Sequence, residues 1–218
     1  MLILILLLLF STASYSATPF KYVLKEMQRK NYAYALVKLK KIKGTPNLMD
    51  RRYFLEAVCL TNLDDSKKAI NRLKKIKNKF NGVDFELGKA FYFTGDFKKA
   101  KNYFKKSINQ GYKKAQSYHY LGNSYFKQEN FRAAKTSFQT LLTKTTPSKW
   151  VLQDTYYQIG SIHLEISKRE LRPEDMKNIL KDHVLTYFKK SLQISPESKV
   201  AREVRKKIYL VKTKYEIN

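Results

Sequence analysis

The chain has 218 residues, 43% of them apolar, which is enough to bury a substantial core in one or two compact domains. Glycine and proline are scarce, with 7 and 5 residues, so the composition favours helices over a turn-rich β-sheet protein. With 44 basic and 18 acidic residues the net charge is +26, which favours acidic proteins, anionic membrane surfaces or nucleic acid as partners.

The N-terminal residues predict an export signal. An apolar run, Met1–Phe10, precedes the small and hydroxylated residues Ser11–Ala17, which is the layout of a secretory signal peptide. We predict a signal peptide over residues 1–16, cleaved after Ser16, and a periplasmic or secreted mature protein. The run is shorter than the roughly 20 residues that span a bilayer. Because no Lys or Arg precedes it, an uncleaved membrane anchor and an intracellular protein are the alternatives.

The chain contains one cysteine, Cys59, which cannot form an internal disulfide bond. It lies within an apolar helical run, where cysteine most often serves as a small core residue. The alternative is an exposed reactive or intermolecular thiol. We predict a core position.

Two segments of the chain repeat at a spacing of 34 residues. Five positions match without a gap: Leu87 with Leu121, Gly88 with Gly122, Phe91 with Tyr125, Ala100 with Ala134, and Phe104 with Phe138. The periodicity predicts two helices in each copy, separated by a break. The glycine lets a neighbouring helix approach closely, and the aromatic residue three positions later is expected to fill the gap beside it. Such a helix pair cannot bury its apolar face alone, so stacked copies are expected.

This pattern resembles the tetratricopeptide repeat (TPR) family, over about residues 20–196. The resemblance implies an all-α fold: a right-handed α-solenoid of antiparallel helix pairs, with about four repeats and terminal capping helices. We expect a single domain over residues 17–218. Its units are expected at residues 20–46 (partial), 50–80, 81–114, 115–148 and 153–196, followed by a capping helix at 197–215.

Three departures from the family pattern carry expectations of their own. In the unit at 50–80, Glu56 stands where leucine is expected and Ala57 where glycine is common. In the unit at 153–196 the second helix arrives twelve residues late, which predicts an inter-helix insertion near residues 167–180. For the capping helix we expect Ser195 as the N-cap, because proline follows at the first helical position.

In TPR proteins the first helix of each pair lines a concave surface where partners bind. The resemblance therefore implies a set of partner-binding residues: Phe54, Phe85, Lys89, Tyr92, Phe93, His119, Tyr120, Asn123, Phe126 and Tyr157, with Val58 and Ser161 beside them. This aromatic set suits an apolar or amphipathic segment of a protein or peptide partner. The alternative for Phe85, Phe93 and Phe126 is packing between repeats. A chaperone-type carboxylate clamp is not expected, because its basic positions are occupied by Phe85 and His119.

The lysines of the helix expected at residues 97–108 are predicted to form a solvated convex face, because they lie opposite Ala100 and Phe104. The alternative function is an electrostatic adaptor that binds an anionic membrane or envelope polymer through such faces. Nucleic acid is not expected as a partner, since only 9 of the 44 basic residues are arginine. The sequence contains no nucleophile elbow, paired-cysteine metal motif or phosphate-binding loop, so we expect no enzyme activity, cofactor or metal.

Overall fold

A computed structural model describes residues 19–217 of the chain, apart from the side chains of residues 173 and 174. The predicted signal peptide lies outside the described residues. Within them every regular element is a helix, which confirms the all-α prediction. None of the described helices is long and apolar enough to cross a membrane.

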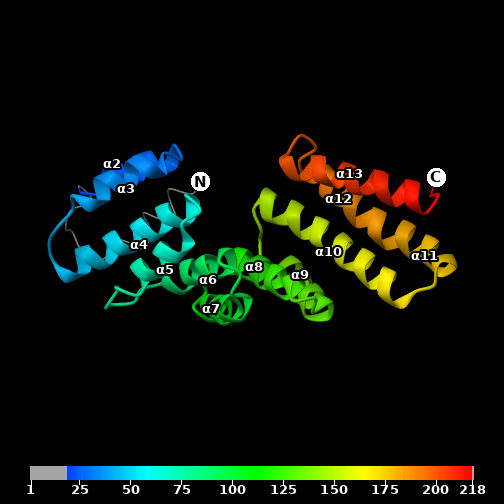
Figure 1. Cartoon of the computed structure of the whole chain (residues 1–218), viewed down its shortest axis with the longest axis horizontal. Coiled ribbons are helices and arrows are strands. Elements are labelled where there is room, and N and C mark those ends of the chain that lie inside the picture. The colour runs from blue at the N-terminus through cyan, green and yellow to red at the C-terminus, as the bar shows by residue number, and fades with distance from the viewer. Residues whose placement is uncertain (1–18, 218) are drawn as a thin grey trace. The chain divides into compact units, whose positions relative to one another are not determined.

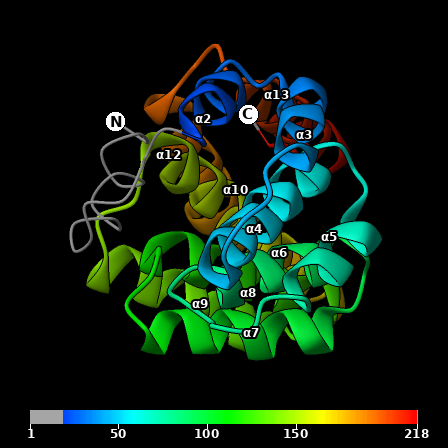
Figure 2. The same cartoon turned by 90° about the vertical axis from the view of Figure 1, so that its left-hand side faces the viewer.

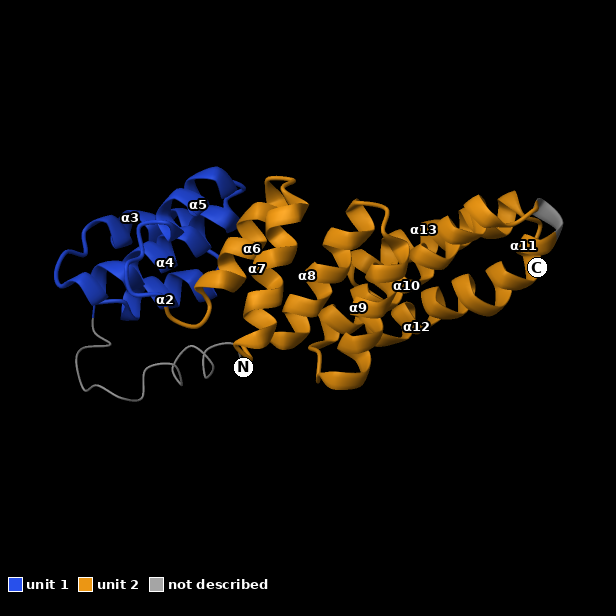
Figure 3. Cartoon of the chain, turned by 90° about the horizontal axis from the view of Figure 1, so that it is seen from below, with its two compact units in different colours: residues 1–79 blue, residues 80–218 orange. Residues whose placement is uncertain are grey.

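The chain divides into two compact units, one ending at Lys79 and the other beginning at Phe80 (Figure 3), where a single domain was predicted. Unit 1 holds two helix pairs: α2 (Lys21–Gln28) with α3 (Tyr32–Lys40), and α4 (Pro46–Asn62) with α5 (Ser66–Leu73). Its core includes Leu39, Leu55 and Cys59. The predicted partial unit at 20–46 is therefore a complete pair of short helices.

Glu56 departs from the repeat pattern because it joins the two helices of its pair through charge. Its carboxylate is fully buried and lies 2.7 Å from Arg52 on the same helix and 2.8 Å from Arg72 on α5. A buried carboxylate is tolerated only when it is paired in this way. Ala57, at the position where glycine is common, is also fully buried.

Unit 2 begins with two helix pairs of equal design. They are α6 (Val83–Phe93) with α7 (Phe97–Asn109), and α8 (Lys114–Lys127) with α9 (Phe131–Lys144). Asp96 and Asn130 each lie between the two helices of a pair, and the side chain of each caps the helix that follows. Figure 2 shows α7 and α9 together on one side of α6 and α8. The predicted units at 81–114 and 115–148 match these pairs.

The glycine in each first helix faces the ring of a phenylalanine in the second helix. A Cβ atom on Gly122 would come within 2.7 Å of the Phe138 ring, and Gly88 meets Phe104 at the same distance. Both rings are fully buried. The close approach predicted for the glycine is therefore present, but the filling ring comes from the second helix and not from the residue three positions later.

The fourth pair is longer than the others. Helix α10 (Lys149–Glu170) is followed by a second helix that runs from α11 (Pro173–Ile179) through a π-helical segment, η1 (Leu180–Leu185), into α12 (Thr186–Ile194). Gly160 again meets the ring of Phe188, but 28 residues separate this glycine and ring, against 16 from Gly122 to Phe138. Residues 167–180 thus extend both helices and form no separate inter-helix insertion.

The last helix, α13 (Lys199–Lys214), covers α10 and α12 (Figure 1). Its N-cap is Ser198, whose hydroxyl accepts a hydrogen bond from the backbone of Ala201, and not Ser195 as predicted. The reason lies in Gln153 of α10, a buried amide that donates to the carbonyl of Ser195 and accepts from the Ser198 hydroxyl. Gln153 thus fixes the turn that leads into α13.

Candidate functional site

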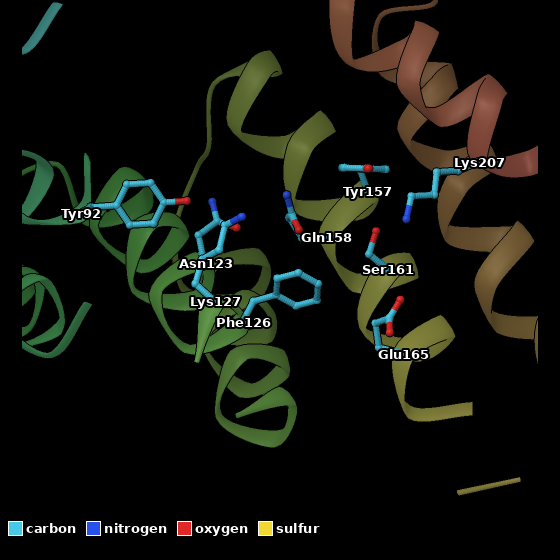
Figure 4. Close-up of a pocket in the computed structure, with 9 residues that line it drawn as sticks. All are labelled: Tyr92, Asn123, Phe126, Lys127, Tyr157, Gln158, Ser161, Glu165 and Lys207. Atoms are coloured by element: carbon cyan, nitrogen blue, oxygen red, sulfur yellow. The ribbon is translucent and has the colours of Figure 1, made fainter. Parts of the chain in front are cut away.

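A groove in unit 2 gathers side chains from several of its helices. Its volume is about 190 Å³, and four helices line it: α6, α8, α10 and α13. We call it the unit-2 groove (Figure 4), defined by Tyr92, Asn123, Phe126, Lys127, Tyr157, Gln158, Ser161, Glu165 and Lys207. Most of the lining comes from the first helix of successive pairs.

The groove brings together four of the residues predicted to bind a partner: Tyr92, Asn123, Phe126 and Tyr157. Ser161, predicted beside them, also lines it. Half of the Phe93 side chain is exposed, and its ring contacts those of Tyr92 and Tyr120. Lys89, His119 and Tyr120 lie on the same helices as the groove but do not line it.

Two of the predicted residues lie elsewhere. Phe85 is only 3% exposed, and its ring packs edge-on against those of Phe104, Tyr112 and Tyr120. This burial agrees with the packing alternative for Phe85. Phe54 belongs to unit 1, where it packs against the core.

The tyrosines of the groove are held by other rings. Tyr92 contacts Tyr120 at a centroid distance of 5.4 Å, and Tyr157 stacks on the buried Phe188 at 5.8 Å. Burial, with smaller effects of Tyr120 and Asp154, raises the pKa of Tyr92 to about 12. Its hydroxyl therefore stays protonated at neutral pH and can donate a hydrogen bond to a bound segment.

A polar network joins α8 to α10 behind the groove. The Nε2 atom of His119 lies 2.6 Å from a carboxylate oxygen of Asp154, and the amide nitrogen of Asn123 lies 3.3 Å from the same ring nitrogen. Trp150, half exposed, packs edge-on against the His119 ring. Because the carboxylate can only accept, Nε2 donates to Asp154 and cannot also accept from the Asn123 amide, so His119 joins α8 to α10 through Asp154 while Asn123 lies beside it on α8.

The charged residues of the groove were not predicted. Lys127 lies one helical turn after Asn123, and Glu165 lies one turn after Ser161, so the four-residue spacing could have indicated both. Lys207 could not have been found in this way, because its place depends on how α13 docks on α10. Gln158 follows Tyr157 directly and faces the groove because the groove wraps around that side of α10.

Other reactive side chains give no sign of a catalytic centre in the part of the chain that the structure describes. Cys59 is fully buried, as predicted, and burial raises the pKa of its thiol to about 12, so it is protonated and a poor nucleophile. No group of three or more His, Cys, Asp or Glu side chains in residues 19–217 could hold a metal ion.

Comparison with known proteins identifies the repeats. Residues 85–109 and residues 116–144 each match a sequence model of the tetratricopeptide repeat, so the chain contains TPRs in its first two unit-2 pairs. No curated protein matches the chain as a relative.

Three solved structures show how widely the fold is shared. A chain of the APC/C hetero-tetramer Cut9–Hcn1 has a TM-score of 0.66 at 15% identity, covering 87% of this chain and 35% of that one, so the chain spans about a third of its length. MamA 41-end from Desulfovibrio magneticus RS-1 has a TM-score of 0.60 at 15% identity, and the match covers 83% of this chain and 95% of that one. YrrB, described as a TPR protein with an unusual peptide-binding site, has a TM-score of 0.59 at 14% identity, and the match covers 88% of this chain and 92% of that one. Identities this low establish the TPR fold alone.

Proposed function

We propose that the chain is a non-enzymatic scaffold that binds a segment of a partner protein in the unit-2 groove. The observation that carries the proposal is the groove itself, where side chains from four helices combine aromatic rings with hydrogen-bonding groups. Such a surface suits an extended or helical peptide, because rings bury apolar side chains while amides and hydroxyls satisfy polar groups. The unusual peptide-binding site of YrrB, which has the same fold, is consistent with this use.

The sharpest test blocks the groove without touching the core. Gln158 is partly exposed and lines the groove, so Gln158→Trp should fill it. Gln139, exposed on the outer side of α9, provides the matched control, Gln139→Trp. The probe is a displayed library of random twelve-residue peptides, selected on the wild-type protein.

Selected peptides should bind Gln158→Trp at least about tenfold more weakly than the wild type, because the ring occupies space that a bound side chain needs. They should bind Gln139→Trp equally well. Unfolding midpoints of both variants, measured by circular dichroism, show that each is folded. Equal binding to the wild type and Gln158→Trp would exclude the groove as the binding site.

We also propose that the protein acts outside the cytoplasm, in the cell envelope or secreted. The apolar run before Ser11 and the small residues up to Ala17 support this location. Amino-terminal sequencing of the protein from cells that export it should begin at Ala17. A mature protein that begins at Met1 would rule out cleavage.

A second candidate function is adhesion to an anionic surface. The observation in its favour is the outer face of α7, where Lys98, Lys99, Lys105 and Lys106 are exposed while Ala100 and Phe104 are fully buried. Exposed lysines of this kind attract anionic lipid or polymer, and the attraction weakens as salt is added.

A further inference from the structure

Helix α13 forms one wall of the unit-2 groove in addition to covering the last helix pair. Val204 and Val211 anchor it in the core, at 0% and 4% exposure, and Ile208 packs against the same cluster. Lys207 lies three residues after Val204 and four before Val211, at the edge of this buried face. Its side chain therefore extends along the groove toward Tyr157 and Ser161 of α10 (Figure 4).

The hydrogen bonds around Gln153 hold this wall in place. The Gln153 amide contacts the carbonyls of Ser191 and Ser195 at 3.2 and 2.8 Å and the hydroxyl of Ser198 at 2.8 Å. These contacts join α10 to the end of α12 and the start of α13. Because the start of α13 is fixed, the position of Lys207 along the groove is fixed as well.

The charges in the groove are unbalanced. Its one carboxylate, Glu165, is already paired with Lys168 at 2.9 Å. Among the described residues no carboxylate lies within ion-pair distance of Lys127 or Lys207. Two ammonium groups thus face the groove without an acidic partner, in a chain whose net charge is +26.

We infer that Lys207 selects an acidic side chain in the bound segment, next to a large apolar side chain held between Phe126 and Tyr157. The inference rests on the proposed function and names the chemistry of its partner. Charge complementarity carries it: an ammonium group that is partly withdrawn from water gains more from a carboxylate than a fully exposed one does. The terminal helix is therefore a specificity element of the groove.

The test repeats the peptide selection with Lys207→Glu and with a matched control, Lys206→Glu. Lys206 is the neighbouring residue, 73% exposed at its side chain and 3.7 Å from Glu203. The library peptides are joined to the display scaffold at their carboxyl ends, so any selected acid is a side chain. Peptides selected on the wild type and on Lys206→Glu should carry Asp or Glu beside an aromatic or large apolar residue, and those selected on Lys207→Glu should carry Lys or Arg there.

A selected peptide then gives the size of the effect. Lys207→Gln should weaken its binding about fivefold, as expected for loss of one partly exposed ion pair, and Lys207→Glu by tenfold or more. The same peptide with its acidic residue changed to Asn or Gln should bind the wild type and Lys207→Gln within about twofold. Circular dichroism of each variant checks that α13 is still folded.

The outcomes separate this inference from the proposed function. If peptides depend on an open groove, through Gln158→Trp, but show no acidic preference and no response to Lys207→Glu, the inference is wrong and the groove remains. If no peptide is selected, or if Gln158→Trp has no effect, both are wrong. A charge preference that Lys206→Glu reverses as strongly as Lys207→Glu would show only the general charge of α13, and would also overturn the inference.

Discussion

The Phe138 ring packs directly against Gly122, in space that a side chain at position 122 would occupy. The Phe138 ring is fully buried and lies where a Cβ atom on residue 122 would stand, at 2.7 Å. Glycine in a helix costs about 1 kcal/mol relative to alanine, so a site that keeps it must gain more from the close contact. The same arrangement recurs at Gly88 and Gly160.

We predict that Gly122→Ala destabilises the protein by about 1–3 kcal/mol, although alanine favours the helix. The added methyl group must displace the Phe138 ring, which is fully buried. Urea unfolding followed by circular dichroism measures the change. Asn102→Ala, at an exposed position of α7, is the control and should be neutral or slightly stabilising. Stabilisation by Gly122→Ala would contradict the proposed contact.

The glycines and the phenylalanines were both found from the 34-residue spacing, but their pairing was not. Sequence spacing gives the face on which a residue lies, and Phe91 three positions after Gly88 was the nearest aromatic on that measure. Which ring enters the gap depends on the tertiary approach of the second helix, and the structure places Phe104 there. Likewise, the sequence marked Glu56 as unusual, but the reason was visible only once Arg72 was brought beside it.

At the scale of the element, the longest helix pair carries a stack of rings. His163 of α10 stacks on His183 of η1 at 5.1 Å and on Tyr187 of α12 at 5.7 Å. A π-helical turn joins residues five apart by hydrogen bonds, where an α-helix joins residues four apart. Here the π-helical turn lies in the second helix of the pair, where His183 meets His163. The sequence pattern located the extra residues but predicted an insertion between the two helices, because helix patterns do not show how two helices share an extension.

We predict that this stack makes the pair sensitive to acid. Burial of His163, with smaller effects of Lys135 and His183, lowers its pKa from 6.5 to about 4. The unfolded chain therefore takes up a proton first as the pH falls, and the contribution of neutral His163 is lost between about pH 6.5 and about pH 4. Because the ring is half-buried, the loss is about 1 kcal/mol.

His163→Phe keeps a flat ring in the stack but does not titrate, so it is the matched variant. Urea unfolding of both proteins at pH 7.5 and pH 5 gives the change in free energy of unfolding. The wild type should lose more stability than His163→Phe, and this difference should appear above pH 5, before most carboxylates are protonated. An equal loss in both proteins would assign the acid sensitivity to other groups.

At the scale of the whole molecule, the net charge of +26 is not concentrated in the proposed binding site. The sequence predicted that the lysines of α7 face away from its buried side, and the exposure of Lys98, Lys105 and Lys106 confirms this for those three. Lys101 is only partly exposed, because its ammonium group lies 4.6 Å from the centroid of the Tyr125 ring. The division into two units was not predicted, because the repeat pattern continues across residues 79 and 80 without a break in composition. The lining residues on α6, α8 and α10 were predicted in part, because these are the first helices of their pairs. The contribution of α13, through Lys207, was not predicted.

We predict that the outer lysines of α7 and the groove act independently. Replacing Lys98, Lys105 and Lys106 together with Gln lowers the net charge from +26 to 26 − 3 = +23. At 0.15 M salt charges are screened over about 8 Å, so binding of a groove-selected peptide should change by less than about twofold. Stability should change by no more than about 0.5 kcal/mol per substitution, since all three side chains are exposed.

The same triple variant tests adhesion to an anionic surface, with phosphatidylglycerol vesicles as the probe. If the second candidate function is correct, the wild type sediments with these vesicles at low salt, releases them as salt rises, and loses this binding in the triple variant while its peptide affinity is unchanged. A variant that loses peptide affinity and vesicle binding together would mean that the two surfaces are one site. If the variant still binds the vesicles, the lysines of α7 are not the surface that contacts anionic lipid, and the second candidate function loses its supporting observation.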